Sequence, residues 1–325
     1  MKKRMMASLL CLCLILTCLP AAALAADYGN PDLPQLGLGT REEVVADTYY
    51  LLDAAGSLTA GSEDAYNLYF EDDSKTLHLK NAALKSSLYV PGGTTIELDG
   101  ENSIENAGTG IQAQTAGGVT ISGTGSLEIT STTEGVLVRR DSTGDIVVKG
   151  SASLTLHAAA YGISNNGGGS ILIEENAAVT STGSQPAISA ENIVISDNAE
   201  VSVQSSISAD AVLRIAGKAV VTATDTLYGD TGIEILDQAD VTVTSRTAGL
   251  NAFRGPIEID GTVSILSTGA GNGAITVGQD DLDSDCTITI RGTAVLSAYN
   301  GLLNSAGGDV VVDGGILKVQ SSSEA

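Results

Sequence analysis

The sequence predicts an all-β protein folded as a right-handed parallel β-helix: a three-sided solenoid of about ten coils with an aromatic-rich N-terminal β cap. The first observation is a repeated unit, and residues 193–203, IVISDNAEVSV, are a clear copy of it. Ile193 and Ile195 stand two positions apart, a turn follows, and the same alternation resumes with Val201 and Val203. This pattern is typical of two short strands that each bury one face.

The second observation is the period of this unit. Eight further copies begin at Val119, Ile146, Ile171, Leu213, Ile233, Ile257, Ile288 and Val310. The second inward residue recurs after 20 to 31 residues, with a mean near 24. Such a period indicates stacked coils, because no single unit can bury its apolar face alone. At the corner within each unit, Asn176 and Asn198 are expected to adopt the left-handed conformation, which asparagine tolerates.

The third observation is a short strand between the units that closes each coil. A small residue followed by an apolar one recurs there, as in Gly110-Ile111, Gly135-Val136, Ala187-Ile188, Gly249-Leu250 and Ala274-Ile275. Three strands in each coil, stacked about 4.8 Å from those of the next coil, describe a parallel β-helix.

Composition divides the chain into four ranges. Residues 1–25 begin with basic residues, continue with an apolar run and end at Ala23-Leu24-Ala25, the pattern of a secretory signal peptide. We expect residues 26–47 to form a linker or flexible arm, 48–90 a cap with β-hairpins, and 91–325 the β-helix, truncated at its C-terminus. The protein is therefore predicted to be extracellular, secreted or at the cell surface, with no membrane span in the mature chain.

The cap is predicted from its aromatic content. Six of the nine tyrosines lie between Asp27 and Pro91, where large side chains are expected to cover the open end of the solenoid. Residues 66–79 and 48–59 indicate hairpins, and a helix that starts at the capping-box pattern of residues 40–43 is the alternative.

The chain is strongly acidic. It has 16 Lys and Arg residues against 39 Asp and Glu residues, a net charge of −23, and loss of the leader with its three basic residues makes this −26. Such a charge excludes nucleic acid as a partner and repels polyanions unless a divalent cation bridges them. Three of the four cysteines lie in the leader, and Cys286 is expected to be a buried core residue.

Outward positions of the second strand predict a ligand-binding face. They form a hydroxyl ladder of Thr155, Thr180, Ser202, Thr222 and Thr242, beside a second column that contains Thr130, His157 and Thr182. A flat hydroxyl face suits a glycan. Stacked hydroxyls are also common in parallel strands without any ligand, and an ice-binding array is the third interpretation.

The longest coil predicts a calcium site. Its loop carries Asp280, Asp281, Asp283 and Asp285, whose spacing places oxygen ligands at alternate positions. A solvated acidic loop is the alternative, because Cys286 and Gly292 stand where a calcium loop of the EF-hand type needs glycine and glutamate.

No catalytic constellation is predicted, and we expect the protein not to be an enzyme. The chain has two histidines, and neither is placed by the sequence beside a nucleophile or a pair of carboxylates. Tryptophan, a common sugar-stacking side chain, does not occur in the sequence.

The segments YNLYFEDDSKTLHLKNAAL, IELDGENSI and GVTISGTGSLEIT resemble secreted or surface β-helix proteins of anaerobic bacteria grouped as carbohydrate-binding domain proteins. The resemblance covers about residues 48–320 and implies the fold and, for some members, calcium-dependent pectin binding. Asp230 is the nearest match to an acidic residue that this family often carries ahead of a Gly-Ile strand.

We therefore expect a non-catalytic carbohydrate-binding or adhesive module, whose partner is a polysaccharide or a host or cell-surface glycan. A structural spacer or stalk of a larger surface protein is the first alternative. A polysaccharide lyase or glycoside hydrolase is the second.

Overall fold

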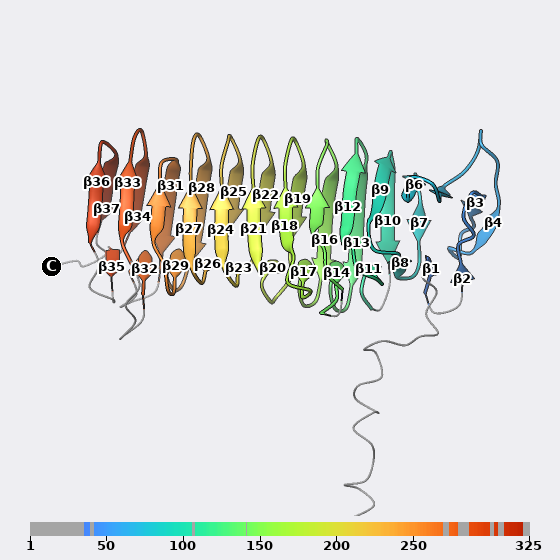
Figure 1. Cartoon of the computed structure of the whole chain (residues 1–325), viewed down its shortest axis with the longest axis horizontal. Coiled ribbons are helices and arrows are strands. Elements are labelled where there is room, and N and C mark those ends of the chain that lie inside the picture. Colours follow the sequence, from blue (N-terminus) through green and yellow to red (C-terminus); the bar gives the residue numbers. More distant parts are fainter. Residues whose placement is uncertain are drawn as a thin grey trace, which may run out of the picture. The chain divides into compact units, whose positions relative to one another are not determined.

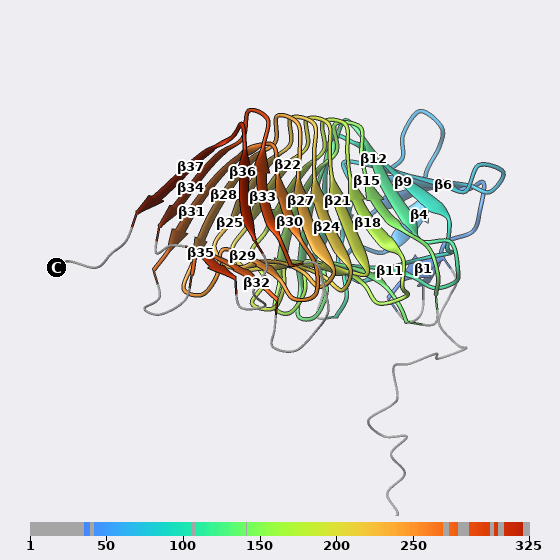
Figure 2. The ribbon, with the colours of Figure 1, turned by 60° about the vertical axis from the view of Figure 1, so that its left-hand side comes forward.

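The structure is a computed structural model that describes residues 36–39, 42–105, 108–140, 142–268, 273–278, 286–299, 302–304 and 309–320. The chain divides into two units, and all of the described residues lie in the second one, Gln35–Ala325. They form strands without any helix, and the strands belong to three sheets. Strands of successive coils lie side by side along the solenoid (Figure 1; Figure 2).

Each complete coil gives one strand to each sheet, so that consecutive strands of a sheet are three apart in the numbering. Sheet 1 contains β3 (Tyr49–Leu52), β4 (Leu58–Ala60), β5 (Leu68–Glu71), β6 (Thr76–Lys80), β9 (Thr94–Asp99), β12 (Val119–Gly123), β15 (Ile146–Val148), β18 (Ser170–Ile173), β21 (Asn192–Ile195), β24 (Val212–Ile215), β27 (Gly232–Ile235), β30 (Ile257–Ile259), β33 (Ile288–Arg291) and β36 (Val310–Asp313). Sheet 2 contains β7 (Ala83–Leu84), β10 (Glu101–Glu105), β13 (Ser126–Ser131), β16 (Ser153–Ala158), β19 (Ala178–Ser181), β22 (Glu200–Val203), β25 (Val220–Ala223), β28 (Asp240–Ser245), β31 (Thr262–Ser267), β34 (Val295–Tyr299) and β37 (Ile316–Gln320). Sheet 3 contains β1 (Gly37–Leu38), β2 (Glu42–Glu43), β8 (Leu88–Val90), β11 (Ile111–Ala113), β14 (Val136–Val138), β17 (Ile163–Asn165), β20 (Ile188–Ala190), β23 (Ile207–Ala209), β26 (Leu227–Gly229), β29 (Leu250–Ala252), β32 (Ile275–Val277) and β35 (Leu302–Asn304).

The core of the solenoid follows the predicted register. The second inward residues of the nine units pair in one continuous column: Ile121, Val148, Ile173, Ile195, Ile215, Ile235, Ile259, Ile290 and Val312. All of them except Val312 are completely buried. Because each coil covers the apolar face of its neighbour, the prediction of a three-sided solenoid of about ten coils is confirmed. Cys286 is 1% exposed and belongs to this core, as expected.

The corner between sheets 1 and 2 differs from the prediction. The left-handed residue precedes the expected Asn198: φ is 62° at Glu175, 60° at Asp197 and 61° at Asp237. The Asp197 carboxylate accepts a hydrogen bond of 3.0 Å from the backbone N–H of Glu175, and Asp237 accepts one of 3.1 Å from Gly217. An acidic residue here therefore links neighbouring coils, which offsets the cost of its backbone conformation.

The N-terminal end is closed by antiparallel strands. Both predicted hairpins are present, because β3 pairs with β4 and β5 pairs with β6. β6 also pairs in parallel with β9, so the first coil begins at Thr76, inside the range expected for the cap. The described part of the expected arm adds β1, which pairs with the edge of β8 and buries Leu38, and β2, which pairs with β1. This pairing satisfies backbone groups at a sheet edge.

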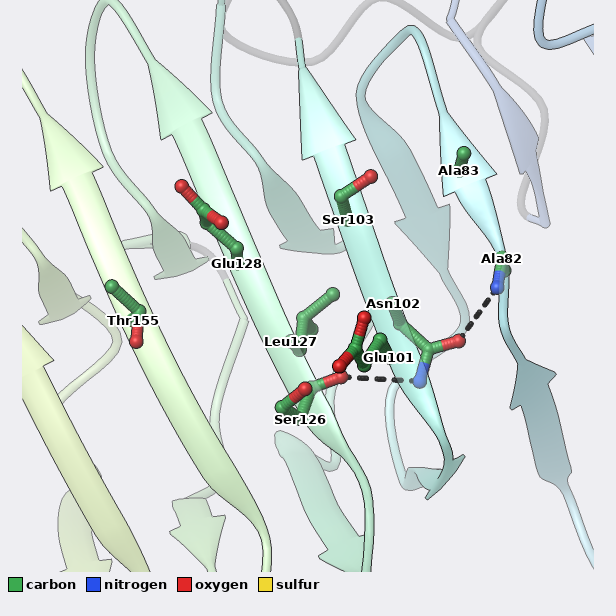
Figure 3. A pocket seen from close by; sticks show the side chains of 9 residues that line it. All are labelled: Ala82, Ala83, Glu101, Asn102, Ser103, Ser126, Leu127, Glu128 and Thr155. Carbon is green, nitrogen blue, oxygen red and sulfur yellow. Dashed lines mark hydrogen bonds between the residues drawn. The ribbon is translucent and has the colours of Figure 1, made fainter. Parts of the chain in front are cut away.

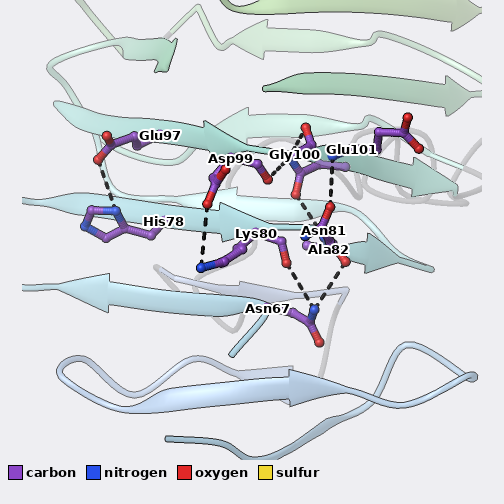
Figure 4. A network of polar contacts seen from close by, with 10 residues as sticks. Asn67, His78, Lys80, Asn81, Ala82, Glu97, Asp99, Gly100 and Glu101 are labelled. Atoms are coloured by element: carbon purple, nitrogen blue, oxygen red, sulfur yellow. Dashed lines mark hydrogen bonds and ion pairs between the residues drawn. The ribbon is translucent and has the colours of Figure 1, made fainter. Parts of the chain in front are cut away.

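The tyrosines of the cap are divided between the two faces: Tyr50 packs against the core, as predicted, whereas Tyr49 and Tyr69 point outward. Leu68 and Phe70 face inward, whereas Tyr69 lies in an outward column between Tyr49 and His78. The Tyr49 and Tyr69 rings stack with centroids 4.2 Å apart. Farther along the column, His78 Nδ1 lies 3.0 Å from Glu97 Oε2 (Figure 4). Strand alternation sends every second side chain outward, so an aromatic-rich strand is divided between the two faces.

Candidate ligand-binding face

The predicted hydroxyl ladder exists as a straight column on the outer face of sheet 2. Thr155, Thr180, Ser202, Thr222 and Thr242 occupy paired positions on β16, β19, β22, β25 and β28. All but the half-buried Thr155 are exposed. Within the described residues, none of these five hydroxyls is engaged in a hydrogen bond, which leaves their donors and acceptors to solvent or a ligand.

A polar chain that sequence reasoning missed connects the column of the ladder with the second column beside it. Glu128 Oε1 lies 3.4 Å from Nε2 of His157, whose Nδ1 lies 3.1 Å from Thr182 Oγ1. These three side chains come from consecutive coils. In the sequence, the sign of this chain was that its members occupy outward-facing positions. The Thr182 hydroxyl also donates to the Leu156 carbonyl at 3.4 Å. The chain therefore links polar side chains of three consecutive coils on one face.

The ladder ends at a hollow on the same face of sheet 2. Its volume is about 470 Å³, and its lining includes Glu101, Ser103, Glu128 and the predicted ladder residue Thr155 (Figure 3). Asn102 is 4% exposed and fixes two of the lining segments. Its side chain accepts a hydrogen bond from Ala82 N at 2.8 Å and donates one to the Ser126 carbonyl at 3.1 Å.

The hollow follows from side-chain size in one outward column. Ala83, Ser103, Glu128 and Thr155 occupy successive paired positions on β7, β10, β13 and β16. The first two side chains are small and β7 is only two residues long, so space remains beside the longer Glu128. Sequence reasoning identified the column but not this concavity, because the preceding coil lies about 20 residues away in the chain.

The predicted calcium site lies outside the described residues, because Asp280, Asp281, Asp283 and Asp285 fall in a range that the structure does not describe. Across the ranges that are described, no group of three His, Cys, Asp or Glu side chains is arranged to hold a metal ion.

Asp230, which the family resemblance singled out, does not fit a calcium ligand. It is 7% exposed and forms an ion pair with Arg254, while Tyr228 donates a hydrogen bond of 3.1 Å to its Oδ1. The hydrogen bond from Arg254 holds the pKa of Asp230 below its usual value. Burial, together with the Asp230 hydrogen bond, raises the pKa of Tyr228 to about 12. The Asp230 carboxylate is thus already paired with a cation of the chain itself.

Comparisons with known proteins give no relative from which a function could be transferred, so a function can be inferred only from the fold and from these residues. No protein-family model, curated protein or solved structure matches the chain. In the described ranges, no helix combines the length and apolar character that a membrane crossing requires.

Proposed function

We propose that the protein is a non-catalytic, secreted or cell-surface module that binds a glycan along the outer face of sheet 2. The observation that carries the proposal is the ladder of five exposed or half-exposed hydroxyl residues without hydrogen-bond partners among the described residues. Successive strands of a sheet lie about 4.8 Å apart, a spacing comparable to one sugar unit of an extended glycan. Such a row presents repeated donors and acceptors to a repetitive partner.

The proposal is tested by binding and by product formation in one experiment. The protein is incubated with pectic and neutral polysaccharides, once with calcium and once with chelator, and bound glycan, reducing ends and unsaturated products are measured. We expect binding without product. Product formation would support a lyase or hydrolase, and a lack of binding to any glycan would support the structural spacer.

Variants of the ladder locate the surface. Replacing Thr180, Thr222 and Thr242 with Lys should weaken binding at least about fivefold, because long side chains block a flat row of hydroxyls. The matched control replaces Thr95, Thr120 and Thr289 with Lys, since these are outward threonines on sheet 1. Equal losses in both triple variants would place the binding surface elsewhere.

A further inference from the structure

The hollow at the end of the ladder has the dimensions of a ligand site. Its volume of about 470 Å³ falls within the range of roughly 300–1,000 Å³ that is usual for small-molecule sites. Its floor is fixed by the buried Asn102, and its walls combine carboxylates with the hydroxyls of Ser103 and Thr155 (Figure 3). A ligand there would remain in line with the rest of the ladder.

The charge of the hollow is negative and only partly compensated. Glu101 takes part in no ion pair among the described residues, and Glu128 has His157 as its partner at 3.4 Å. The neighbouring lysines are engaged elsewhere. Lys85 pairs with Glu105 at 2.8 Å. Lys80 pairs with Asp99 at 3.7 Å (Figure 4). The hollow therefore lacks a positive charge that matches both of its carboxylates.

We infer that the hollow binds a sugar unit that carries a protonated amine, such as a 2-amino-2-deoxyhexose unit of a glycan. This inference rests on the proposed function and names its ligand class. An ammonium group would form charge-assisted hydrogen bonds with Glu101 and Glu128, and ring hydroxyls would meet Ser103 and Thr155. A uronate unit would instead place a like charge beside two carboxylates. Acidic residues are numerous throughout this chain, so negative charge alone does not define the site. The concave shape of the hollow and the hydroxyls of Ser103 and Thr155 are what select a sugar.

The test compares three trisaccharides with the same β-1,4 linkage: glucosamine, N-acetylglucosamine and glucose. Binding to the full chain is measured by calorimetry at physiological salt, where weak, non-specific attraction of cations is screened. We expect the glucosamine trisaccharide to bind at least about tenfold more tightly than the other two. Spermidine, a cation without sugar hydroxyls, should bind much more weakly than the glucosamine trisaccharide.

Matched variants separate the hollow from the general negative charge. Glu101→Gln and Glu128→Gln should each weaken glucosamine binding about tenfold, which removes most of its advantage over glucose. Glu200→Gln is the control, because Glu200 is exposed and occupies the strand position of Glu101 four coils away, outside the hollow. It should leave binding of all three trisaccharides unchanged. Melting temperatures show that each variant is folded.

The outcomes distinguish the two proposals. If all three trisaccharides bind equally, the amine preference is wrong while glycan binding stands. If Glu200→Gln weakens binding as much as Glu101→Gln, or if spermidine binds as tightly as the sugar, the hollow is not the selective site. If no trisaccharide and no polysaccharide binds, both proposals fail.

Discussion

The inward column of sheet 1 is buried in the middle of the solenoid and exposed at its last described coil. Ile195 and Ile290 are 0% exposed, whereas Val312, in the same column, is 46% exposed. At the other end, Leu77 is 0% exposed because the antiparallel β5 covers it. Among the described strands, β36 pairs only with β33 in sheet 1. The same type of residue is thus buried or exposed according to whether a neighbour lies on both of its sides.

This difference shows where the stability of a solenoid resides. Each coil contributes little by itself, and most of the stabilisation comes from the interfaces between coils. Substitutions should therefore differ in cost by their place along the stack even when the residues are chemically alike. The four predictions below, ordered from the largest to the smallest expected effect, test this comparison.

A charge in the central core should have the largest effect. Ile195→Asp would bury an unpaired carboxylate and should lower the free energy of unfolding by about 4 kcal/mol or more. The matched variant Val312→Asp should lower it by less than about 1 kcal/mol, because this position is largely exposed. Chemical denaturation measures both. Similar losses for the two variants would contradict the dependence on neighbouring coils.

The cap should depend on its inward aromatic residue more than on its outward ones. Phe70 is 3% exposed, and Phe70→Ala should cost about 3 kcal/mol through lost burial and a cavity. Tyr69→Ala removes a partly exposed stacked ring and should cost about 1 kcal/mol. If the tyrosine variant were the more damaging one in thermal unfolding, the outward stack and not the core contact would hold the cap.

At the corner between sheets 1 and 2, substitutions of the adjacent residues Asp197 and Asn198 should have smaller effects on stability that differ from each other. Both alanine variants lose a hydrogen bond to the preceding coil, since Asn198 Nδ2 donates to Asn176 Oδ1 at 3.1 Å. Asp197→Ala also places alanine at a φ of 60°, so it should cost about 1 kcal/mol more than Asn198→Ala. Asp197→Gly loses the hydrogen bond but tolerates the backbone, and should fall between them. Equal stability of Asp197→Ala and Asn198→Ala would contradict the assignment of the left-handed conformation to Asp197 and favour Asn198.

The ion pair between Asp230 and Arg254 in neighbouring coils should have the smallest effect on stability, and this effect should depend on pH. The hydrogen bond from Arg254 lowers the pKa of Asp230, so this stabilisation is present above the unfolded pKa and is lost as pH falls through the folded one. At pH 7 wild type should melt about 2 °C above Asp230→Asn, and the gap should close below about pH 4. A gap that persists at low pH would show that the ion pair is not its source.

The two parts of the candidate site were not equally predictable. The ladder from Thr155 to Thr242 was found in the sequence because a parity argument within each repeat places those residues on one face. The hollow was not found, since it depends on Ala83 and Ser103 lying beside Glu128 in neighbouring coils. The contact between His157 and Glu128 was missed for the same reason, although His157 occupied a predicted outward position.

Local patterns alone define the repeat, the inward column and the hydroxyl ladder, because strand alternation depends only on neighbours two residues apart. The left-handed position of Asp197 follows from the turn geometry, which an alternation pattern does not specify. The pairing of Asp230 with Arg254, the outward stack of Tyr49 and Tyr69, the concavity beside Glu128 and the exposure of Val312 all depend on neighbouring coils or cap strands. Those partners stand at variable separations along the chain, so only the stacked structure brings the side chains together.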